Sequence, residues 1–404
     1  MLVKIAWRNI WRNRSRSIVV ISSIVVGIWA LLFGTGFMNA FMVGYSADII
    51  EHDISNIQVH NADFKTDFDI KYTLEKGKEK ANELSEWDGV KAATTRIISN
   101  GMISAPQKSA GVQIRGIDVE KEALVTSLDS MLIEGTYFED VKRNPIIIGK
   151  KMADNLKVNL RSKVVLTFTD LNGNVTAAAF RVVGIVKSSS ININEFYAFV
   201  RQEDISNLLM IGDQIHEIAL LTAHQFDENI LVDKYNKLYP DDLIETWREL
   251  APELVFMEEA YGSMLYVLMA IIMIALVFGI VNTMLMAVLE RTKELGILMA
   301  VGMNKLRVYL MIVIETVFLS LIGAPIGLFI GFITVSYYAN KGVDLSNYSK
   351  GLEAFGYSSI LYPYLDSIVY PTVTIAVILT AIIGALYPAW KAIKLKPVDA
   401  IHSI

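Results

Sequence analysis

The segment richest in chemical signals runs from Glu290 to Gly302 and directly follows a long apolar stretch. Its sequence is Glu-Arg-Thr-Lys-Glu-Leu-Gly-Ile-Leu-Met-Ala-Val-Gly. Glu290 and Glu294 are four residues apart, so a helix would place both carboxylates on one face. Gly302 is a natural helix stop. We therefore predict a short charged helix, joined firmly to two membrane spans, that can transmit a push from a soluble partner.

Patterns that would indicate catalysis or cofactor binding fail elsewhere in the sequence. Gly149-Lys150 has the ending of a phosphate loop, but Asn144 occupies the position that requires glycine, and no Ser or Thr follows the lysine. The five histidines show no metal-ligand spacing, the chain has no cysteine, and no Gly-x-Ser-x-Gly nucleophile motif occurs. We expect no catalytic site, metal or cofactor in this chain, so the energy for any work would come from a partner.

Four stretches with at most one charged residue are each long enough to cross a bilayer as a helix. These stretches are residues 18–47, 260–289, 308–340 and 367–390. We predict an α-helical membrane protein with four transmembrane helices and a large two-lobed α+β extracytoplasmic domain, residues 48–259, inserted between the first and second helices. The remaining segments are 1–17 (an amphipathic entry helix), 290–307 (a cytoplasmic coupling helix and loop), 341–366 (an extracytoplasmic loop) and 391–404 (a cytoplasmic tail).

Charge sets the expected orientation of the chain. The termini and the connection 290–307 together carry 12 basic residues against three acids, whereas residues 46–261 carry 23 basic and 35 acidic residues, a net charge of −12. By the positive-inside rule, both termini and the connection lie in the cytoplasm and the large domain lies outside. The first apolar run is also longer than that of a cleaved signal peptide, so we expect an uncleaved anchor.

Residues 1–17 carry an apolar stripe beside basic side chains. The stripe consists of Val3, Trp7, Ile10 and Trp11. Tryptophan next to arginine is typical of a helix that lies in the membrane interface. A plain basic flank of the first span explains the same residues, and the sequence leaves both interpretations open.

The third span has a row of small residues and one acidic residue. The row consists of Gly323, Gly327 and Gly331. Glycine at every fourth position lets another helix approach closely, either within this chain's own bundle or at a seam between two copies. Pro325 lies inside the row and predicts a kink. Glu315 is a functional candidate because charge within a span is costly, although snorkelling toward the interface or pairing on its own helix, about two turns from Arg307, would also explain it.

The inserted segment alternates strand-like and helix-like patterns, which predicts an α+β domain. The expected strands are Ile54–Val59, Val90–Ser99, Gly111–Ile117, Pro145–Gly149, Lys163–Thr169, Val175–Lys187, Glu217–Thr222 and Leu243–Thr246. The expected helices are Glu75–Trp87, Lys151–Leu156 and Phe226–Leu238. Asp170-Leu-Asn-Gly-Asn174 is a turn signal that predicts a hairpin. Strand–helix–strand order recurs at both ends, so we expect the ends to pack as one lobe and the middle to form a second.

Taken together, these features resemble the membrane subunits of the MacB/LolC/LolE/FtsX group of ABC transporters. The coupling segment resembles the group's pattern Glu-Arg-x-x-Glu-x-Gly-x-x-x-Ala-x-Gly. Other matching pieces are Ala6–Ser17, Val112–Asp118, Glu134-Gly135, Ile148-Gly149 with Ala153 and Leu156, and Pro388–Ala392 with Pro397 and Ala400. The resemblance runs over nearly the full length of the chain.

The resemblance implies a non-catalytic permease in the bacterial inner membrane, with the large domain in the periplasm. It also implies a dimer with a second permease, identical or paralogous, and a separate ABC ATPase dimer that binds ATP and Mg. Carried over by position, the ATPase contact would involve Glu290, Arg291, Glu294, Gly296, Ala300 and Gly302. The alternative is that Glu290 and Arg291 only mark the membrane boundary.

Within the group, the chain is most similar to the LolC/LolE type, because it begins at the entry helix without a fused ATPase and has a large external domain. Chains of that type release lipoproteins from the inner membrane toward a periplasmic chaperone. Three other functions stay open. The chain could be a MacB-like permease for tripartite efflux or peptide export, an FtsX-like regulator of envelope enzymes or signalling, or a structural anchor without an ATPase.

Lipoprotein release would require an apolar path. Three acyl chains carry on the order of 45 methylenes, so their bare exposure to water would cost roughly 35 kcal/mol. We therefore expect a cavity between the first and second spans, at the outer leaflet. Candidate lining residues are Met38, Phe41, Met42, Met264, Leu268 and Ile271. Ordinary bundle packing or lipid contact explains the same residues.

Overall fold

The computed structural model describes residues 2–12, 14–139, 144–223, 226–348, 351–352, 357 and 359–394. Asn13, His224, Pro397, Ala400 and His402, which belong to patterns discussed above, lie outside the described residues. The chain divides into two compact units. The helical unit comprises Met1–Val43, Glu258–Leu345 and Ile360–Ile404, and the inserted domain comprises Gly44–Met257 and Ser346–Ser359.

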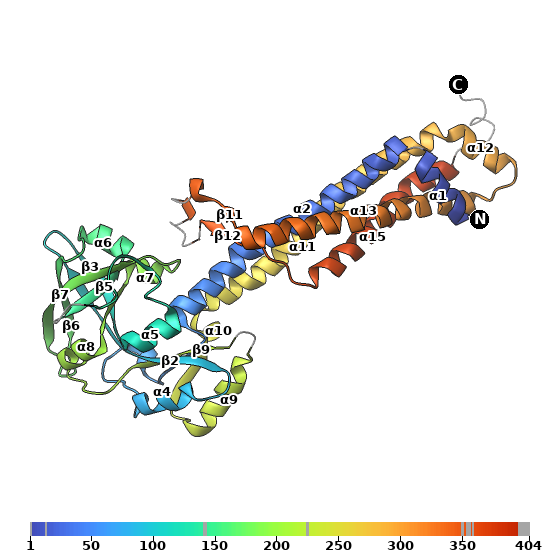
Figure 1. The fold of residues 1–404 in the computed structure, drawn as a ribbon. Helices are drawn as coiled ribbons and strands as arrows, with labels where there is room; N and C mark the ends of the chain where they lie inside the picture. The colour runs from blue at the N-terminus through green and yellow to red at the C-terminus, as the bar shows by residue number, and fades with distance from the viewer. Residues whose placement is uncertain are drawn as a thin grey trace. The chain divides into compact units, whose positions relative to one another are not determined.

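The helical unit is built from long apolar helices (Figure 1). Its helices are α1 (Leu2–Arg12), α2 (Arg14–Ile49), α11 (Pro252–Glu290), α12 (Thr292–Ala300), α13 (Lys305–Lys341) and α15 (Val369–Ile393). Four of these, α2, α11, α13 and α15, are long and apolar enough to cross a membrane. A helix satisfies its own backbone hydrogen bonds, which a span requires in lipid. The prediction of four spans, one before the inserted domain and three after it, is confirmed.

The glycine row of α13 packs against α2 of the same chain. A Cβ atom at Gly323 would lie 3.1 Å from Ile24 Cβ, and one at Gly327 would lie 2.9 Å from Ile28 Cβ. At Gly331 the distance to Leu32 Cδ1 would be 2.5 Å. A side chain at Gly323 or Gly327 would therefore require Ile24 or Ile28 of α2 to move. α13 continues through Pro325 as one helix.

The inserted domain contains a ten-stranded mixed sheet with helices on it (Figure 1). Its strands are β1 (Ile57–Asn61), β2 (Val90–Ser104), β3 (Ser109–Ile117), β4 (Leu132–Gly135), β5 (Pro145–Gly149), β6 (Lys163–Thr169), β7 (Val175–Val186), β8 (Tyr197–Arg201), β9 (Glu217–Thr222) and β10 (Asp242–Thr246). Its helices are α3 (Phe64–Asp67), α4 (Gly77–Ser85), α5 (Val119–Thr126), α6 (Lys150–Leu156), α7 (Ile191–Glu195), α8 (Gln202–Leu209), α9 (Glu228–Leu238) and α10 (Trp247–Leu250). The strand order is β10-β1-β9-β2-β3-β8-β5-β7-β4, and β6 pairs with β2 and β7.

The long strand β2 divides the sheet into two lobes. Its first half, from Val90 to Arg96, pairs with β9, whereas its second half, up to Ser104, pairs with β3 and partly with β6. We call β1, β9 and β10 with the first half of β2 the first lobe, and β3 to β8 with the second half of β2 the second lobe. β1 pairs with both β9 and β10, so the two ends of the domain meet as expected.

Local patterns predicted most of the domain's elements. The hairpin at Asp170 is present, because β6 and β7 pair in antiparallel register from Lys163↔Arg181 to Thr169↔Val175. The strand expected at Ile54–Val59 is wrong at its start. α2 continues as a π-helix, η1 (Ile50–Ile54), and β1 begins only at Ile57. Ser55, with φ 68° and ψ 172°, separates the two, so the apolar alternation there does not reflect one extended segment.

Short elements lie between α13 and α15 in the described part of the chain. Val343–Asp344 (β11) pairs with Ile360–Leu361 (β12) in antiparallel register, and Ser346–Tyr348 (η2) forms one 3-10 turn. The loop predicted at 341–366 therefore includes a small strand pair at its base.

Candidate coupling site

The segment Glu290–Gly302 contains the short helix α12, set between α11 and α13. Glu290 is the last residue of α11, and Arg291 precedes α12 outside the helix, so the two glutamates do not lie on one continuous helix as predicted. Gly302 ends it with φ 99°, a conformation that favours glycine. The Gly302 N–H donates to the Met299 carbonyl at 3.1 Å, and the Met303 N–H donates to the Leu298 carbonyl at 3.0 Å, which is the Schellman arrangement. Asn304 then begins α13 by accepting a hydrogen bond from the Leu306 N–H. The predicted helix stop at Gly302 is confirmed.

Two ion pairs join this segment to the N-terminal helices. Arg12 pairs with Glu294, and Arg16 pairs with Glu290. The glutamate side chains are 53% and 50% exposed, so both carboxylates remain accessible. We call these two contacts the exposed ion pairs. Each brings together segments more than 270 residues apart in the chain.

Arg291 makes a buried contact beside them. Its Nη1 donates to both oxygens of Glu315 on α13, at 3.2 and 3.3 Å, and its Nη2 donates to the Asn9 carbonyl of α1 at 3.3 Å. The two side chains are only 10% and 8% exposed. Arg291 therefore ties α1 and α13 to the start of α12. The carboxylate also neutralises a guanidinium that would be costly to bury alone.

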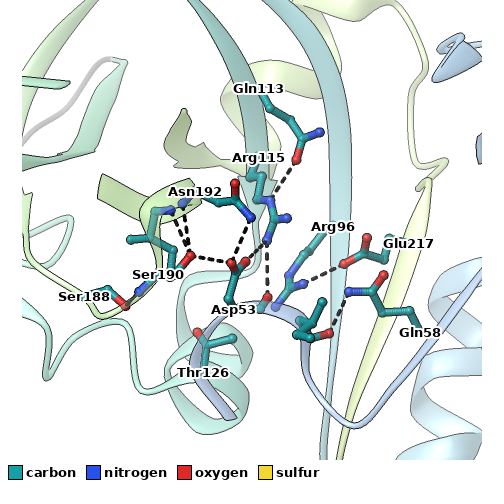
Figure 2. A network of polar contacts seen from close by, with 12 residues as sticks. Asp53, Gln58, Arg96, Gln113, Arg115, Thr126, Ser188, Ser190, Asn192 and Glu217 are labelled. Atoms are coloured by element: carbon teal, nitrogen blue, oxygen red, sulfur yellow. Dashed lines mark hydrogen bonds and ion pairs between the residues drawn. The ribbon is translucent and has the colours of Figure 1, made fainter. Parts of the chain in front are cut away.

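A second polar cluster lies inside the inserted domain. Arg96 donates to Glu122 at 2.7 Å and to Glu217 at 2.6 Å, and His60 Nε2 lies 3.0 Å from the other oxygen of Glu217. All of these side chains are at most 3% exposed. We call this cluster the buried arginine network, and Figure 2 shows Arg96 reaching Glu217 between two strands.

Charge pairing outweighs burial in this network. Burial alone would lower the pKa of Arg96, but the Glu122 and Glu217 carboxylates raise it above its usual value. Burial would likewise raise the pKa of Glu217, yet Arg96 and the hydrogen bond from His60 hold that pKa well below its usual range. Arg96 and Glu217 are therefore both ionised at neutral pH, and their pairing joins β2 to β9.

Two protein-family models match this chain. Residues 17–234 match the MacB-like periplasmic core domain, and residues 266–397 match the FtsX-like permease C-terminal domain. The chain belongs to the MacB/FtsX family of ABC transporter permeases. It is accordingly an inner-membrane permease with its α+β domain on the periplasmic side, and the resemblance stated from the sequence is confirmed.

Individual relatives of the permease are distant but cover most of its length. It is 22% identical to the lipoprotein-releasing system transmembrane protein LolC of Neisseria meningitidis, over 96% of this chain and 94% of that protein. It is 23% identical to the macrolide export ATP-binding/permease protein MacB of Bdellovibrio bacteriovorus, over 96% of this chain and 60% of that protein. Among solved structures, the periplasmic region of MacB from Actinobacillus actinomycetemcomitans aligns with a TM-score of 0.37 and 15% identity, covering 52% of this chain and 97% of that one.

Some of the coupling residues predicted from the sequence lie on the surface of the permease, and others are buried. Glu290, Glu294, Ala300 and Gly302 are exposed, whereas Arg291 and Gly296 are buried. Exposed apolar side chains lie beside the carboxylates on the same segment, chiefly Ile297 and Val301. The surface offered here is thus a pair of acids next to a small apolar patch, a composition suited to contact with a protein.

The contacts of this site were missed by reasoning from spacing. Glu315 pairs with Arg291, not with Arg307 as its position suggested. The sequence indicated Arg12 and Arg16 only as members of the basic N-terminus that sets the orientation and of the Ala6–Ser17 stretch that resembles the family, not as partners of the glutamates. Their spacing of four residues does match the spacing of Glu290 and Glu294, and that match was the one available signal of the pairing.

The candidate lipid-facing residues lie on two helices of the permease. Met264 and Ile271 of α11 are 51% and 59% exposed. The other four are partly buried: Met38, Phe41, Met42 and Leu268. Leu268 also faces Gly34 of α2, where a Cβ would lie 3.9 Å from Leu268 Cδ2. Of the four spans, α11 is the least covered by the rest of the chain, which leaves an apolar face for lipid or another helix.

Proposed function

We propose that this permease couples ATP hydrolysis in a separate ABC ATPase to movement of its periplasmic domain. The supporting observation is α12 itself. Accessible carboxylates lie on it at Glu294 and just before it at Glu290, the last residue of α11, and Arg291 ties its start to α1 and α13. A push on α12 would therefore be transmitted to helices that cross the membrane.

We further propose where the nucleotide binds, how the chain is oriented and which partner completes the dimer. ATP and Mg²⁺ bind in the ATPase dimer, and this chain holds no cofactor. Both termini and α12 lie in the cytoplasm, in line with their excess of basic residues. A second permease, identical or paralogous, completes the dimer, and α11, the least covered of the four long helices, offers it an exposed face.

We further propose that the substrate is a lipoprotein, released from the inner membrane toward a periplasmic chaperone. Two of the relatives that match nearly the whole chain, from Neisseria meningitidis and Haemophilus influenzae, carry the name lipoprotein-releasing system transmembrane protein. Apolar side chains on α2 and α11, such as Phe41 and Met264, would shield acyl chains from water. The equally long match to a MacB protein makes macrolide-type efflux the second candidate.

Copurification tests the coupling proposal. Glu290→Lys with Glu294→Lys reverses both accessible charges, so we expect the ABC ATPase to stop copurifying with the permease. Glu79→Lys with Glu83→Lys is the matched control, because it reverses two exposed carboxylates at the same spacing on α4 of the inserted domain. Retention of the ATPase by the first variant, or its absence from the unmodified permease, would contradict the proposal.

Photocrosslinking separates the two substrates. A photoreactive amino acid at Phe41 or Met264 should crosslink to the acyl chains of a lipoprotein during turnover. Crosslinks to membrane phospholipid alone, together with capture of an outer-membrane channel by the periplasmic domain, would favour efflux instead.

A further inference from the structure

The junction between α2 and the inserted domain departs from regular structure at several consecutive residues. Residues Ile50–Ile54 form a π-helix, a rare geometry that is frequent at functional sites. Ser55 follows with φ 68° and ψ 172°, a backbone region that is essentially restricted to glycine, and its side chain is fully buried. A junction held in such a conformation must be fixed by its surroundings.

Asp53 supplies the contacts that fix it. Its carboxylate accepts hydrogen bonds from Ser190 Oγ at 2.5 Å and from Asn192 Nδ2 at 3.4 Å, and it lies 3.7 Å from Arg115 Nη1. The same Arg115 nitrogen donates to the Asp53 carbonyl at 3.5 Å. Figure 2 shows Asp53 at the centre of these partners, which come from β3 and from the start of α7. The Asp53 side chain is 3% exposed, so these contacts are made away from bulk water.

The partners of Asp53 are themselves held in place. Arg115 Nε donates to Gln113 Oε1 at 3.1 Å, and its guanidinium lies 3.6 Å from the centre of the Tyr197 ring. Ser190 also accepts hydrogen bonds from the Asn192 and Ile193 N–H groups at the start of α7. A displacement of Asp53 would therefore move β3 and α7 rather than a single loose side chain.

Chain connectivity makes this contact unusual. Both membrane connections of the domain enter the first lobe, because α2 leads into β1 and β10 leads into α11. They also meet there, since the Trp247 N–H donates to the Asn56 carbonyl at 2.8 Å. The second lobe follows β2 and precedes β9, so its backbone joins the membrane helices only through the first lobe. Asp53 is a direct side-chain route from the end of α2 to the second lobe.

We propose that Asp53 is the positioning residue that makes the second lobe follow the end of α2. Apart from the contact of His52 Nδ1 with the Thr126 carbonyl of α5, at 2.8 Å, movement of α2 would otherwise reach the second lobe through the sheet, by way of β1, β9 and β2. What drives α2 rests on the proposed function, whereas the link itself is a property of the permease alone and is testable without an ATPase.

Spin-label distances in the full-length permease test the link. The chain has no cysteine, so labels can be placed at introduced cysteines without further changes. One pair, Gly44→Cys with Val175→Cys, spans from α2 to the second lobe. The other pair, Gly44→Cys with Asp241→Cys, spans from α2 to the first lobe. All three positions are exposed.

We expect Asp53→Asn to broaden the distance distribution of the second-lobe pair at least twofold and to leave the first-lobe pair unchanged. Ser190→Ala, which removes one hydrogen bond and no charge, should broaden the same pair less. Asp48→Asn is the matched control on the same helix, and it should change neither pair. Asp48 contacts His52 at 3.3 Å and is partly exposed.

Two results would overturn the proposal. If neither Asp53→Asn nor Ser190→Ala broadens the second-lobe pair, Asp53 does not link it to α2. If both pairs broaden equally, Asp53 supports the whole domain and has no role specific to the second lobe. A separate outcome concerns the proposed function only: if ATP and the ATPase change neither distance in the unmodified permease while Asp53→Asn still broadens one, the link stands and the energy coupling fails.

Discussion

The two ionic clusters of this permease are both built from arginine and glutamate, but one is buried and the other is exposed. The buried arginine network surrounds Arg96 with two carboxylates, and its members are at most 3% exposed. The exposed ion pairs set Arg12 and Arg16 against carboxylates that are half exposed. A buried charge that loses its partner is strongly destabilising, whereas an exposed pair contributes little to stability. The first cluster therefore holds the domain together, and the second is free to exchange its partners.

The helical unit obtains its cohesion from close packing instead. Its glycine row brings α13 so close to α2 that a Cβ at Gly327 would lie 2.9 Å from Ile28 Cβ. Ion pairs there are few, and Arg291–Glu315 is the buried one among the described residues. Removal of a buried charge should thus destabilise the inserted domain, and an increase in side-chain volume at the glycine row should destabilise the helical unit.

Removing Arg96 should produce the largest effect. Arg96→Met leaves Glu122 and Glu217 buried without their cation, so the free energy of unfolding of the inserted domain should fall by about 3–5 kcal/mol. The urea dependence of proteolysis of the full-length permease measures it. Arg181→Met, at an exposed position on β7, is the control and should change stability by less than about 0.5 kcal/mol. Equal effects would show that the network is not structural.

The pH dependence of stability should reveal His216 next. Burial lowers the pKa of His216 to about 4, and the ring is fixed by the Ile98 N–H at Nδ1 and the Ile70 carbonyl at Nε2. The unfolded chain binds this proton near pH 6.5 and the folded chain only near 4. Stability is therefore lost as the pH falls from 6.5 to 4, by about 3 kcal/mol at most.

His216→Gln isolates that contribution. Glutamine keeps one acceptor and one donor but does not titrate, so the variant should lose less stability than the unmodified permease between pH 6.5 and 4. The same urea and proteolysis measurement, repeated across that range, gives the difference. Parallel pH curves for the two proteins would exclude His216 as the source.

In the helical unit, a larger side chain at the glycine row should lower stability more than the reversal of an exposed charge. Gly327→Leu would force a side chain into Ile28, and overpacking costs about 1–3 kcal/mol. Gly279→Leu is the matched control on α11, where a Cβ would meet nothing within 4 Å. Thermal unfolding in detergent should be lowered by the first substitution and not by the second. An unchanged Gly327→Leu variant would contradict packing as the source of cohesion.

The smallest effect on stability should come from the exposed ion pairs. Reversing all four charges, with Arg12→Glu, Arg16→Glu, Glu290→Arg and Glu294→Arg, re-forms both pairs in the opposite sense. Thermal stability should change by less than about 1 kcal/mol, yet ATPase binding should be lost, because the accessible charges are inverted. Intact ATPase binding would show that these pairs matter only for holding the helices together.

The sequence predicts the structural elements that depend on neighbouring residues, but few of the contacts between residues that lie far apart in the chain. Charge-free runs locate the four long helices, and the turn at Asp170 locates a hairpin. The Arg291–Glu315 contact spans 24 residues and the Arg12–Glu294 contact spans 282, so no periodicity reports either. The π-helix before β1 was missed for a related reason, because the partners that stabilise it through Asp53 lie more than 60 residues away in β3 and α7.

Sidedness labelling tests the central claim most directly. The claim is that α12 and the inserted domain lie on opposite sides of the membrane and that one drives the other. In spheroplasts, a membrane-impermeant maleimide should label Lys157→Cys in the inserted domain at once and Lys293→Cys in α12 only after permeabilisation. Labelling of both positions from the same side would contradict the account, because an ATPase that acts on α12 could not then work across the bilayer.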